Sequence, residues 1–216
     1  MRVVVLASGN GSNFQALVDA LHDGSIAGLE IAALVCNVPG APCLGRAVRA
    51  GIPAWLYPPV AASSAPGASR DARRRAYDRH LADIVAQWEP DYVLLLGWMR
   101  LLTTEFLSRF PLRVINMHPA LPGMFPGTHA IEKAYAASRE GTLDRTGVML
   151  HLVPDEGVDC GPVLRQAEIP ISPDDTLESL EAKVHAVEHR ELLALVAELA
   201  ASERQRTVCS TMQERT

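Results

Sequence analysis

RVVVLASGNGSN, residues 2–13, runs from an apolar stretch through a glycine-rich turn into a helical pattern. The β-branched segment Arg2 to Ala7 is typical of a strand that is buried on both faces, as in a parallel sheet. Apolar residues recur at helical spacing from Asn13 to His22, and Ser12 with Gln15 fits a capping box. The segment therefore predicts the first strand and the first helix of an α/β domain, with an anion site at the backbone N–H groups between them.

Strands and helices alternate along the rest of the chain. We expect strands at Ile31–Val35, Ala54–Tyr57, Tyr92–Leu96, Val114–Met117, Gly147–Val153 and Val163–Ile171, and helices at Cys43–Ala50, Arg70–Trp88, Ile131–Ser138 and Thr176–Ala201. Residues 58–69 and His118–Thr128 are expected to be loops. The alternation predicts an α/β fold with an open, mostly parallel, Rossmann-like sheet that carries helices on both faces and binds ligands at the carboxyl ends of its strands. We assign residues 1–202 to one catalytic domain and 203–216 to a polar, frayed C-terminal tail.

Composition excludes several function classes. The chain has 216 residues and a net charge of −5, whereas nucleic-acid-binding domains usually carry basic surfaces, so we expect no nucleic-acid partner. The longest apolar stretches cover about half a bilayer, so we expect no membrane span. The N-terminus lacks a signal-peptide pattern, which predicts a cytoplasmic location. The cysteines have no metal-binding spacing and are interpreted as reduced thiols; they are Cys36, Cys43, Cys160 and Cys209.

The glycine-rich turn does not fit a dinucleotide. Phe14 stands where the fingerprint G-x-G-x-x-G has its third glycine, and Asn37 rather than an acidic residue ends the second strand. Short polar side chains between the glycines favour a single phosphate monoester instead. A plain tight turn with no ligand is the alternative.

A second motif combines an amide, an imidazole and a carboxylate. Asn116 and His118 are two residues apart at the end of a strand, so they share a face, and together they suit a developing oxyanion. The loop PDEGVDCGP, residues 154–162, offers Asp155 and Asp159 as the third member, and a nearby carboxylate is expected to raise the pKa of the imidazole. This set predicts an acyl-transfer site, with ordinary loop polarity as the alternative.

The chain contains five motifs in this order: SGNGSN, GWMRLL, INMHPALPGMFPG, DEGVDCGPV and VEH. With these motifs the chain resembles the phosphoribosylglycinamide formyltransferase family over about residues 1–200. The resemblance implies a transferase that moves the formyl group of 10-formyltetrahydrofolate to the amine of 5-phosphoribosyl glycinamide, in purine biosynthesis and without a metal. Its partners would be these small molecules only, and its assembly a monomer or a homodimer.

The resemblance also assigns residues to roles. It implies that Asn116, His118 and Asp159 are catalytic, with Asp159 favoured over Asp155 by its place before Cys160-Gly161-Pro162. The implied substrate contacts are Gly11, Ser12 and Asn13 for the phosphate and Glu188 for the glycinamide part. The implied folate contacts are Arg74, Met99, Arg100, Leu101, Leu102 and Asn116, with Arg73 and Arg75 as neighbours that could replace Arg74. The family's usual His-Pro-Ser-Leu-Leu-Pro is here His-Pro-Ala-Leu-Pro-Gly, residues 118–123.

Other interpretations remain open on the sequence alone. The pattern H-x-x-E-H at residues 185–189 matches an inverted zinc-peptidase motif, although little chain follows it to supply a third ligand. A deformylase or another transferase that uses 10-formyltetrahydrofolate would share the same chemistry, and a phosphosugar-binding module would lack turnover. We expect the remaining histidines to belong to no functional cluster; they are His22, His80, His129 and His151.

Overall fold

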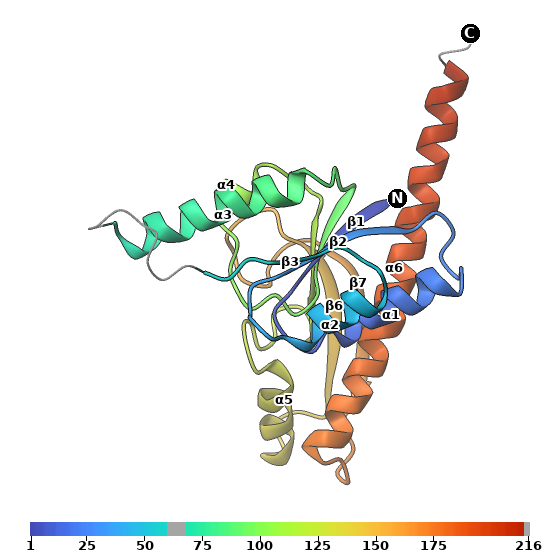
Figure 1. Ribbon diagram of the computed structural model, residues 1–216. Helices are drawn as coiled ribbons and strands as arrows, with labels where there is room; N and C mark the ends of the chain where they lie inside the picture. Colours follow the sequence, from blue (N-terminus) through green and yellow to red (C-terminus); the bar gives the residue numbers. More distant parts are fainter. Residues whose placement is uncertain (60–67, 214–216) are drawn as a thin grey trace.

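The computed structural model describes residues 1–59 and 68–213, with side chains described through residue 206, and is built around one sheet (Figure 1). The strands are β1 (Arg2–Ala7), β2 (Glu30–Cys36), β3 (Ala54–Leu56), β4 (Tyr92–Leu95), β5 (Val114–His118), β6 (Arg145–Leu152) and β7 (Val163–Pro170). The helices are α1 (Ser12–His22), α2 (Pro42–Arg49), α3 (Arg70–Ala86), α4 (Thr104–Leu107), α5 (Ala130–Arg139) and α6 (Leu177–Gln213). Among these residues, no helix has the length and apolarity that crossing a bilayer requires.

The sheet is parallel from β3 to β5 and antiparallel at its other edge. Its strand order is β3-β2-β1-β4-β5-β6-β7, with β6 antiparallel to β5 and β7 antiparallel to β6. The parallel strands β1, β4 and β5 are neighbours, so their carboxyl ends meet at one edge. Ser8 after β1 donates its N–H to the Gly97 carbonyl after β4 at 3.0 Å, which joins two of the predicted motifs there. The predicted mostly parallel α/β sheet is confirmed.

Apolar side chains pack helices against both faces of this sheet (Figure 1). Along β1, Val3 and Val5 join the apolar layer that contains α1 and α6, whereas Val4 and Leu6 join the layer that contains α3 and α4. A strand covered on both sides has no polar position, which explains the continuous β-branched run in the sequence. A smaller cluster packs α5 and the first half of α6 onto β6 and β7.

Helix α1 begins differently from the prediction. The expected capping box does not form, because Gly11 is the N-cap residue and Ser12 is already helical. Gly11 has a left-handed φ of 76°, and a Cβ there would stand 2.6 Å from the Cβ of Cys43. Only glycine satisfies both conditions, so contact with α2 rather than a side-chain cap fixes where α1 starts.

The closing helix is longer than predicted. α6 continues past Ala201 to Gln213, so residues 203–213 are helical rather than frayed. Tyr92 donates its hydroxyl to Glu203 at 3.4 Å, and Arg204 donates to the Ala27 carbonyl, which ties this stretch to the domain. At the other end, Thr176 and Ser179 cap the start of the helix, because each donates its backbone N–H to the hydroxyl of the other. Of the predicted loop 58–69 and the predicted tail, residues 60–67 and 214–216 lie outside the described residues.

The contact between Gly11 and Cys43 gives a stability prediction. Gly11→Ala should lower the free energy of unfolding by roughly 2–5 kcal/mol, because left-handed strain adds to overpacking. Gly40→Ala is the matched control: its φ is 75°, but nothing lies within 4 Å of the added Cβ, so it should lose only about 1–2 kcal/mol. Urea denaturation of both variants measures the difference, and equal losses would contradict the packing argument.

Candidate active site

The end of β5 carries the predicted amide and imidazole on one face. Asn116 and His118 are the third and fifth residues of this five-residue strand, and His118 is buried with 3% of its surface exposed. In the antiparallel register with β6, Asn116 lies opposite His151. A side chain from the neighbouring strand is therefore added to the pair that the sequence predicted.

The Asp159 carboxylate completes this group from the loop between β6 and β7. Its Oδ1 accepts a hydrogen bond from Asn116 Nδ2 at 2.9 Å, and its Oδ2 accepts one from the Gly127 N–H at 2.8 Å. His118 Nδ1 lies 3.4 Å from Oδ2. Asp155, the other candidate, accepts a hydrogen bond from the Gly157 N–H within its own loop instead. The structure thus places Asp159, and not Asp155, beside His118.

The two nitrogens of His118 differ in their surroundings. Nδ1 faces a carboxylate, which can only accept, so in the neutral ring Nδ1 carries the proton. Nε2 then presents a lone pair, and it is buried without a hydrogen-bond partner among the described residues. An unpaired buried acceptor is costly unless a ligand uses it. His118 Nε2 is therefore positioned to take a proton from a bound molecule.

Burial determines the charge state of His118. The pKa of His118 lies below its ordinary value because burial disfavours the imidazolium, and the nearby charge of Asp159 offsets this only in part. The expectation that Asp159 raises the pKa above the ordinary value is therefore wrong in its net direction. Burial also acts to raise the pKa of Asp159, but the adjacent His151, the hydrogen bond from the Gly127 N–H and the His118 imidazole outweigh it and lower the value. The resting pair is a neutral imidazole beside a carboxylate.

His151 belongs to the same cluster, contrary to expectation. Its Nδ1 lies 2.8 Å from the Leu152 carbonyl, to which it donates, so its Nε2 is left as an acceptor 3.2 Å from Asn116 Nδ2. The two amide hydrogens of Asn116 are thus directed at Asp159 and His151. The sequence pattern missed His151 because only the antiparallel register of β6 brings it opposite Asn116.

The glycine-rich turn is held from two sides. Arg46 of α2 donates to the Asn10 carbonyl at 2.9 Å and to its side-chain oxygen at 2.8 Å. On the other side, Asn13 donates to the buried Glu188 of α6 at 3.2 Å, and the Oδ1 of Asn13 is buried without a partner. The N–H groups at the start of α1 lie between these contacts. The structure therefore brings Gly11, Ser12, Asn13 and Glu188 together.

The H-x-x-E-H motif forms an ion pair in this structure. His185 Nδ1 lies 2.8 Å from Glu188 Oε2, the same oxygen that accepts from Asn13. This hydrogen bond raises the pKa of His185, whereas burial lowers the pKa of His189. Within the described part of the chain, no group of three or more histidine, cysteine, aspartate or glutamate side chains is arranged to hold a metal ion.

The segment after β4 forms a partly apolar wall. Met99 and Leu101 are 66% and 50% exposed, whereas Leu102 is buried. The Arg100 guanidinium stands 4.5 Å above the centre of the Tyr77 ring. Met99 donates its N–H to the Ser8 hydroxyl at 2.9 Å, which fixes this wall next to the glycine-rich turn. Exposed apolar side chains beside a polar cluster suit a flat aromatic ligand.

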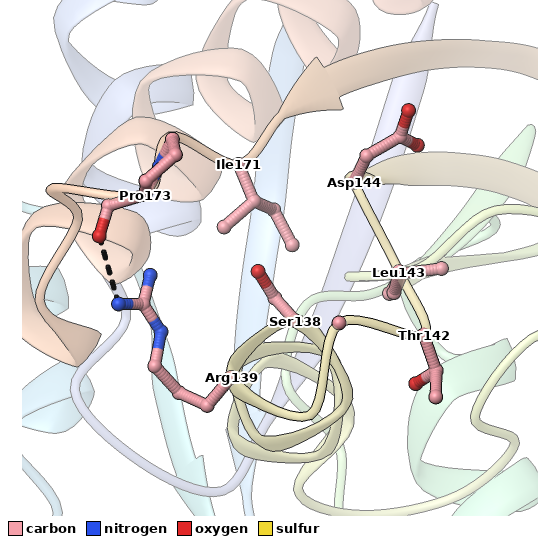
Figure 2. A pocket seen from close by; sticks show the side chains of 8 residues that line it. Ser138, Arg139, Thr142, Leu143, Asp144, Ile171 and Pro173 are labelled. Atoms are coloured by element: carbon pink, nitrogen blue, oxygen red, sulfur yellow. Dashed lines mark hydrogen bonds between the residues drawn. The ribbon is translucent and has the colours of Figure 1, made fainter.

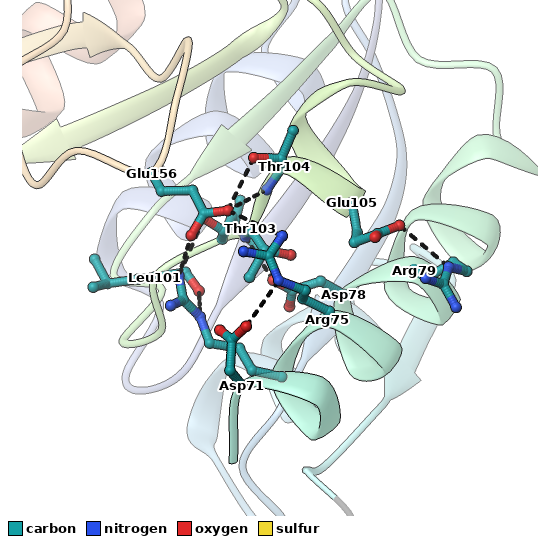
Figure 3. Close-up of polar contacts among 11 residues, drawn as sticks. Asp71, Arg75, Asp78, Arg79, Leu101, Thr103, Thr104, Glu105 and Glu156 are labelled. Atoms are coloured by element: carbon teal, nitrogen blue, oxygen red, sulfur yellow. Dashed lines mark hydrogen bonds and ion pairs between the residues drawn. The ribbon is translucent and has the colours of Figure 1, made fainter. Parts of the chain in front are cut away.

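Arg74 of α3 braces this wall in the structure. Its guanidinium donates to the carbonyl of Leu101 at 3.3 Å and to that of Leu102 at 3.4 Å. It also lies 3.6 Å from Glu156, an acidic side chain in the Asp159 loop that the sequence did not single out. Figure 3 shows Glu156 next to Thr104 and Arg75 of α3. A separate pocket between α5 and the loop before α6 contains none of the predicted site residues (Figure 2).

Comparison with known proteins places this geometry in a family. The family model described as "Formyl transferase" matches residues 1–196. The chain belongs to the formyl transferase family. A phosphoribosylglycinamide formyltransferase of Schizosaccharomyces pombe is 40% identical over 193 residues, covering 87% of this chain and 91% of the relative. One from Escherichia coli is 38% identical over 189 residues, covering 88% and 82%.

A solved structure of the family has the same fold. The glycinamide ribonucleotide transformylase 1 of Symbiobacterium toebii superposes with a TM-score of 0.81 at 35% identity, covering 94% of this chain and 88% of that one. The resemblance that the sequence motifs indicated is confirmed at the level of family and fold. The roles of the individual site residues remain predictions.

The pairing of Asp159 with His118 can be measured directly. NMR titration of His118 should give a pKa below its ordinary value of about 6.5, because burial dominates. Asp159→Asn should lower this pKa further, since it removes the charge that favours the imidazolium. Asp155→Asn, which alters only the turn contact to Gly157, should leave the titration unchanged. A rise in the pKa of His118 in Asp159→Asn would contradict this assignment.

Proposed function

We propose that this protein transfers the formyl group of 10-formyltetrahydrofolate to the amine of 5-phosphoribosyl glycinamide. The observation that carries the proposal is the buried His118 Nε2, which has no hydrogen-bond partner in the part of the chain that the structure describes and lies beside Asn116 and Asp159 at the sheet edge that also carries the glycine-rich turn. The names of the formyl transferase relatives support the same substrate and reaction.

The phosphate of the glycinamide substrate is assigned to the glycine-rich turn. The N–H groups at the start of α1 and the positive end of its dipole favour an anion, with Gly11, Ser12 and Asn13 as its contacts. His185, whose pKa is raised by its hydrogen bond to Glu188, adds positive charge next to Asn13 when it is protonated. Glu188 is assigned to the glycinamide part of the substrate. Binding the phosphate away from the reacting carbon can orient the amine for attack.

The folate is assigned to the wall after β4. The exposed side chains of Met99 and Leu101 offer apolar surface to its ring system, and the backbone of Arg100 and Leu102 offers polar contacts beside it. Asn116 of β5 is assigned to the folate as well. Arg74 is assigned to the folate side as well, next to the two carbonyls that it already braces.

His118 moves one proton in the proposed reaction. When the neutral amine attacks the formyl carbon, the amine nitrogen becomes positive and the formyl oxygen becomes negative. His118 Nε2 takes a proton from that nitrogen as general base and then donates it to the departing N10 nitrogen of the folate. The amine loses one proton and N10 gains one, so the reaction balances. Asp159 stabilises the imidazolium that exists between the two steps.

Asn116 is assigned to donate a hydrogen bond to the developing oxyanion. One of its amide hydrogens stays on Asp159 at 2.9 Å, which fixes the plane of the amide. The other faces His151 at the longer distance of 3.2 Å, and the oxyanion is a stronger acceptor than a neutral imidazole. Asn116 therefore exchanges its contact with His151 for the oxyanion as charge develops.

The small-molecule substrates and the acidic net charge of −5 support a cytoplasmic enzyme without a nucleic-acid or membrane partner. We propose a monomer or a homodimer that works without a metal.

The phosphate assignment is tested by substrate truncation. The dephosphorylated glycinamide riboside should lose at least about 100-fold in kcat/KM, because remote binding energy no longer orients the amine. Ser12→Ala and Asn13→Ala should raise KM for the phosphorylated substrate and leave folate binding nearly unchanged. Initial rates with both substrates measure these effects; equal rates with the riboside would show that the turn binds no phosphate.

The roles of His118 and Asp159 are tested by substitution. His118→Gln should lower kcat by about 10²–10⁴-fold, since it removes the proton carrier, and Asp159→Asn by about 10²-fold. His129→Gln is the matched control: His129 is exposed and, among the described residues, its side chain pairs only with Glu132, so kcat should stay unchanged. Formyl transfer is followed by release of tetrahydrofolate. Binding of both substrates without turnover in the unaltered protein would instead identify a binding module.

A further inference from the structure

The Glu156 carboxylate joins three elements (Figure 3). Its Oε1 accepts hydrogen bonds from the backbone N–H and the hydroxyl of Thr104, both at 2.9 Å. Arg74 and Arg75 of α3 each lie 3.6 Å from the carboxylate. The Thr104 contacts lower the pKa of Glu156, with smaller contributions from the arginines, so the group is ionised at neutral pH. One side chain thus ties the loop between β6 and β7 to α3 and to the start of α4.

Two glycines of this loop have neighbours that leave no room for a side chain. A Cβ at Gly157 would stand 2.5 Å from the sulfur of Cys160, and Gly161 lies so close to the last carbonyl of β6 that any side chain would overlap it. Contacts this close leave the two turns of the loop little room to change shape. A shift at Glu156 therefore reaches Asp159, three residues further along the chain.

The backbone of Asp159 depends on such support. Its φ is 50°, in the left-handed region that residues other than glycine rarely adopt. A residue keeps this conformation only when its surroundings hold it there. The carboxylate contacts with Asn116 and Gly127 hold one side of the loop, and Glu156 holds the other.

The contacts of Glu156 also reach the proposed folate wall, the segment that follows β4. Thr104 follows directly after the segment 99–103, and Arg74 touches Glu156 while it donates to the carbonyls of Leu101 and Leu102. The same carboxylate therefore fixes the distance between the Asp159 loop and that wall.

We infer that Glu156 is a positioning residue, which holds the Asp159 loop against the folate wall so that Asp159 meets His118. The inference rests on the proposed formyl transfer for its effect on rate, but the position of Asp159 can be followed without turnover. The titratable groups that face His118 are Asp159 from this loop and His151 from β6. Glu156 acts on His118 through Asp159.

Two variants separate positioning from a direct effect of charge. Glu156→Gln keeps the shape but removes the negative charge. Thr104→Pro removes both short hydrogen bonds to Glu156 and changes no charge. Proline is tolerated there because Thr104 is the first residue of α4 and Thr103 before it is extended, with φ −93° and ψ 167°.

Glu105→Gln is the matched control. Glu105 also ties α4 to α3, through Arg79 at 3.2 Å, but it does not touch the Asp159 loop. Each variant is checked for an unchanged melting temperature, and then kcat and the NMR titration midpoint of His118 are measured in the full chain.

Both Glu156→Gln and Thr104→Pro should lower kcat by about 10- to 100-fold and move the His118 titration to lower pH, because Asp159 withdraws from the imidazole. Glu105→Gln should change neither. If Thr104→Pro leaves the titration unchanged while Glu156→Gln shifts it, Glu156 acts by charge alone and the inference is overturned. Unchanged values in both variants overturn it as well. If the unaltered protein shows no formyl transfer, the proposed function fails, and the His118 titration alone decides whether Glu156 positions Asp159.

Discussion

The carboxylate of Asp159 connects the parts of the chain that must act together. It accepts hydrogen bonds from Asn116 on β5 and from Gly127 in the loop that follows, and it lies next to His118 and His151. Because these groups come from β5, β6 and two loops, the geometry of the cluster exists only when all four are in place. The left-handed backbone of Asp159 and the anchor at Glu156 are consequences of bringing one carboxylate to this point.

Burial and charge act against each other at this cluster, and burial dominates at the histidine. His118 is 3% exposed, so the desolvation of its cation outweighs the attraction of the adjacent carboxylate. A neutral imidazole with a buried lone pair is a better proton acceptor for an amine than an imidazolium would be. The carboxylate then has its largest effect after the proton has arrived, when the imidazolium forms beside it. The carboxylate therefore stabilises the imidazolium that exists during the reaction more than it changes the resting, neutral histidine.

The fold and the members of the site could be predicted from sequence to different depths. The apolar run after Arg2 predicted a strand of the parallel sheet, and the Asn116–His118 strand end predicted which residues share a face at its edge, because strand periodicity is a local property. The place of His151 in the cluster follows from the antiparallel register of β6, and the contact of Glu156 follows from the approach of its loop to α4. Such contacts between distant segments leave no periodic signal. The direction of the pKa shift of His118 could not be predicted from the sequence either, because it depends on how deeply the side chain is buried, and no motif encodes burial.

The most direct test of this account is the pH dependence of kcat under saturation with both substrates, from about pH 5.5 to pH 8.5. A neutral His118 that takes and returns one proton predicts that kcat falls only on the acid side of the ordinary histidine pKa of about 6.5, because burial lowers the pKa of His118, and that kcat does not decline toward pH 8.5. A kcat that decreases about tenfold for each pH unit above pH 6.5 would show that the resting enzyme requires an imidazolium. That result would contradict the proton relay through His118.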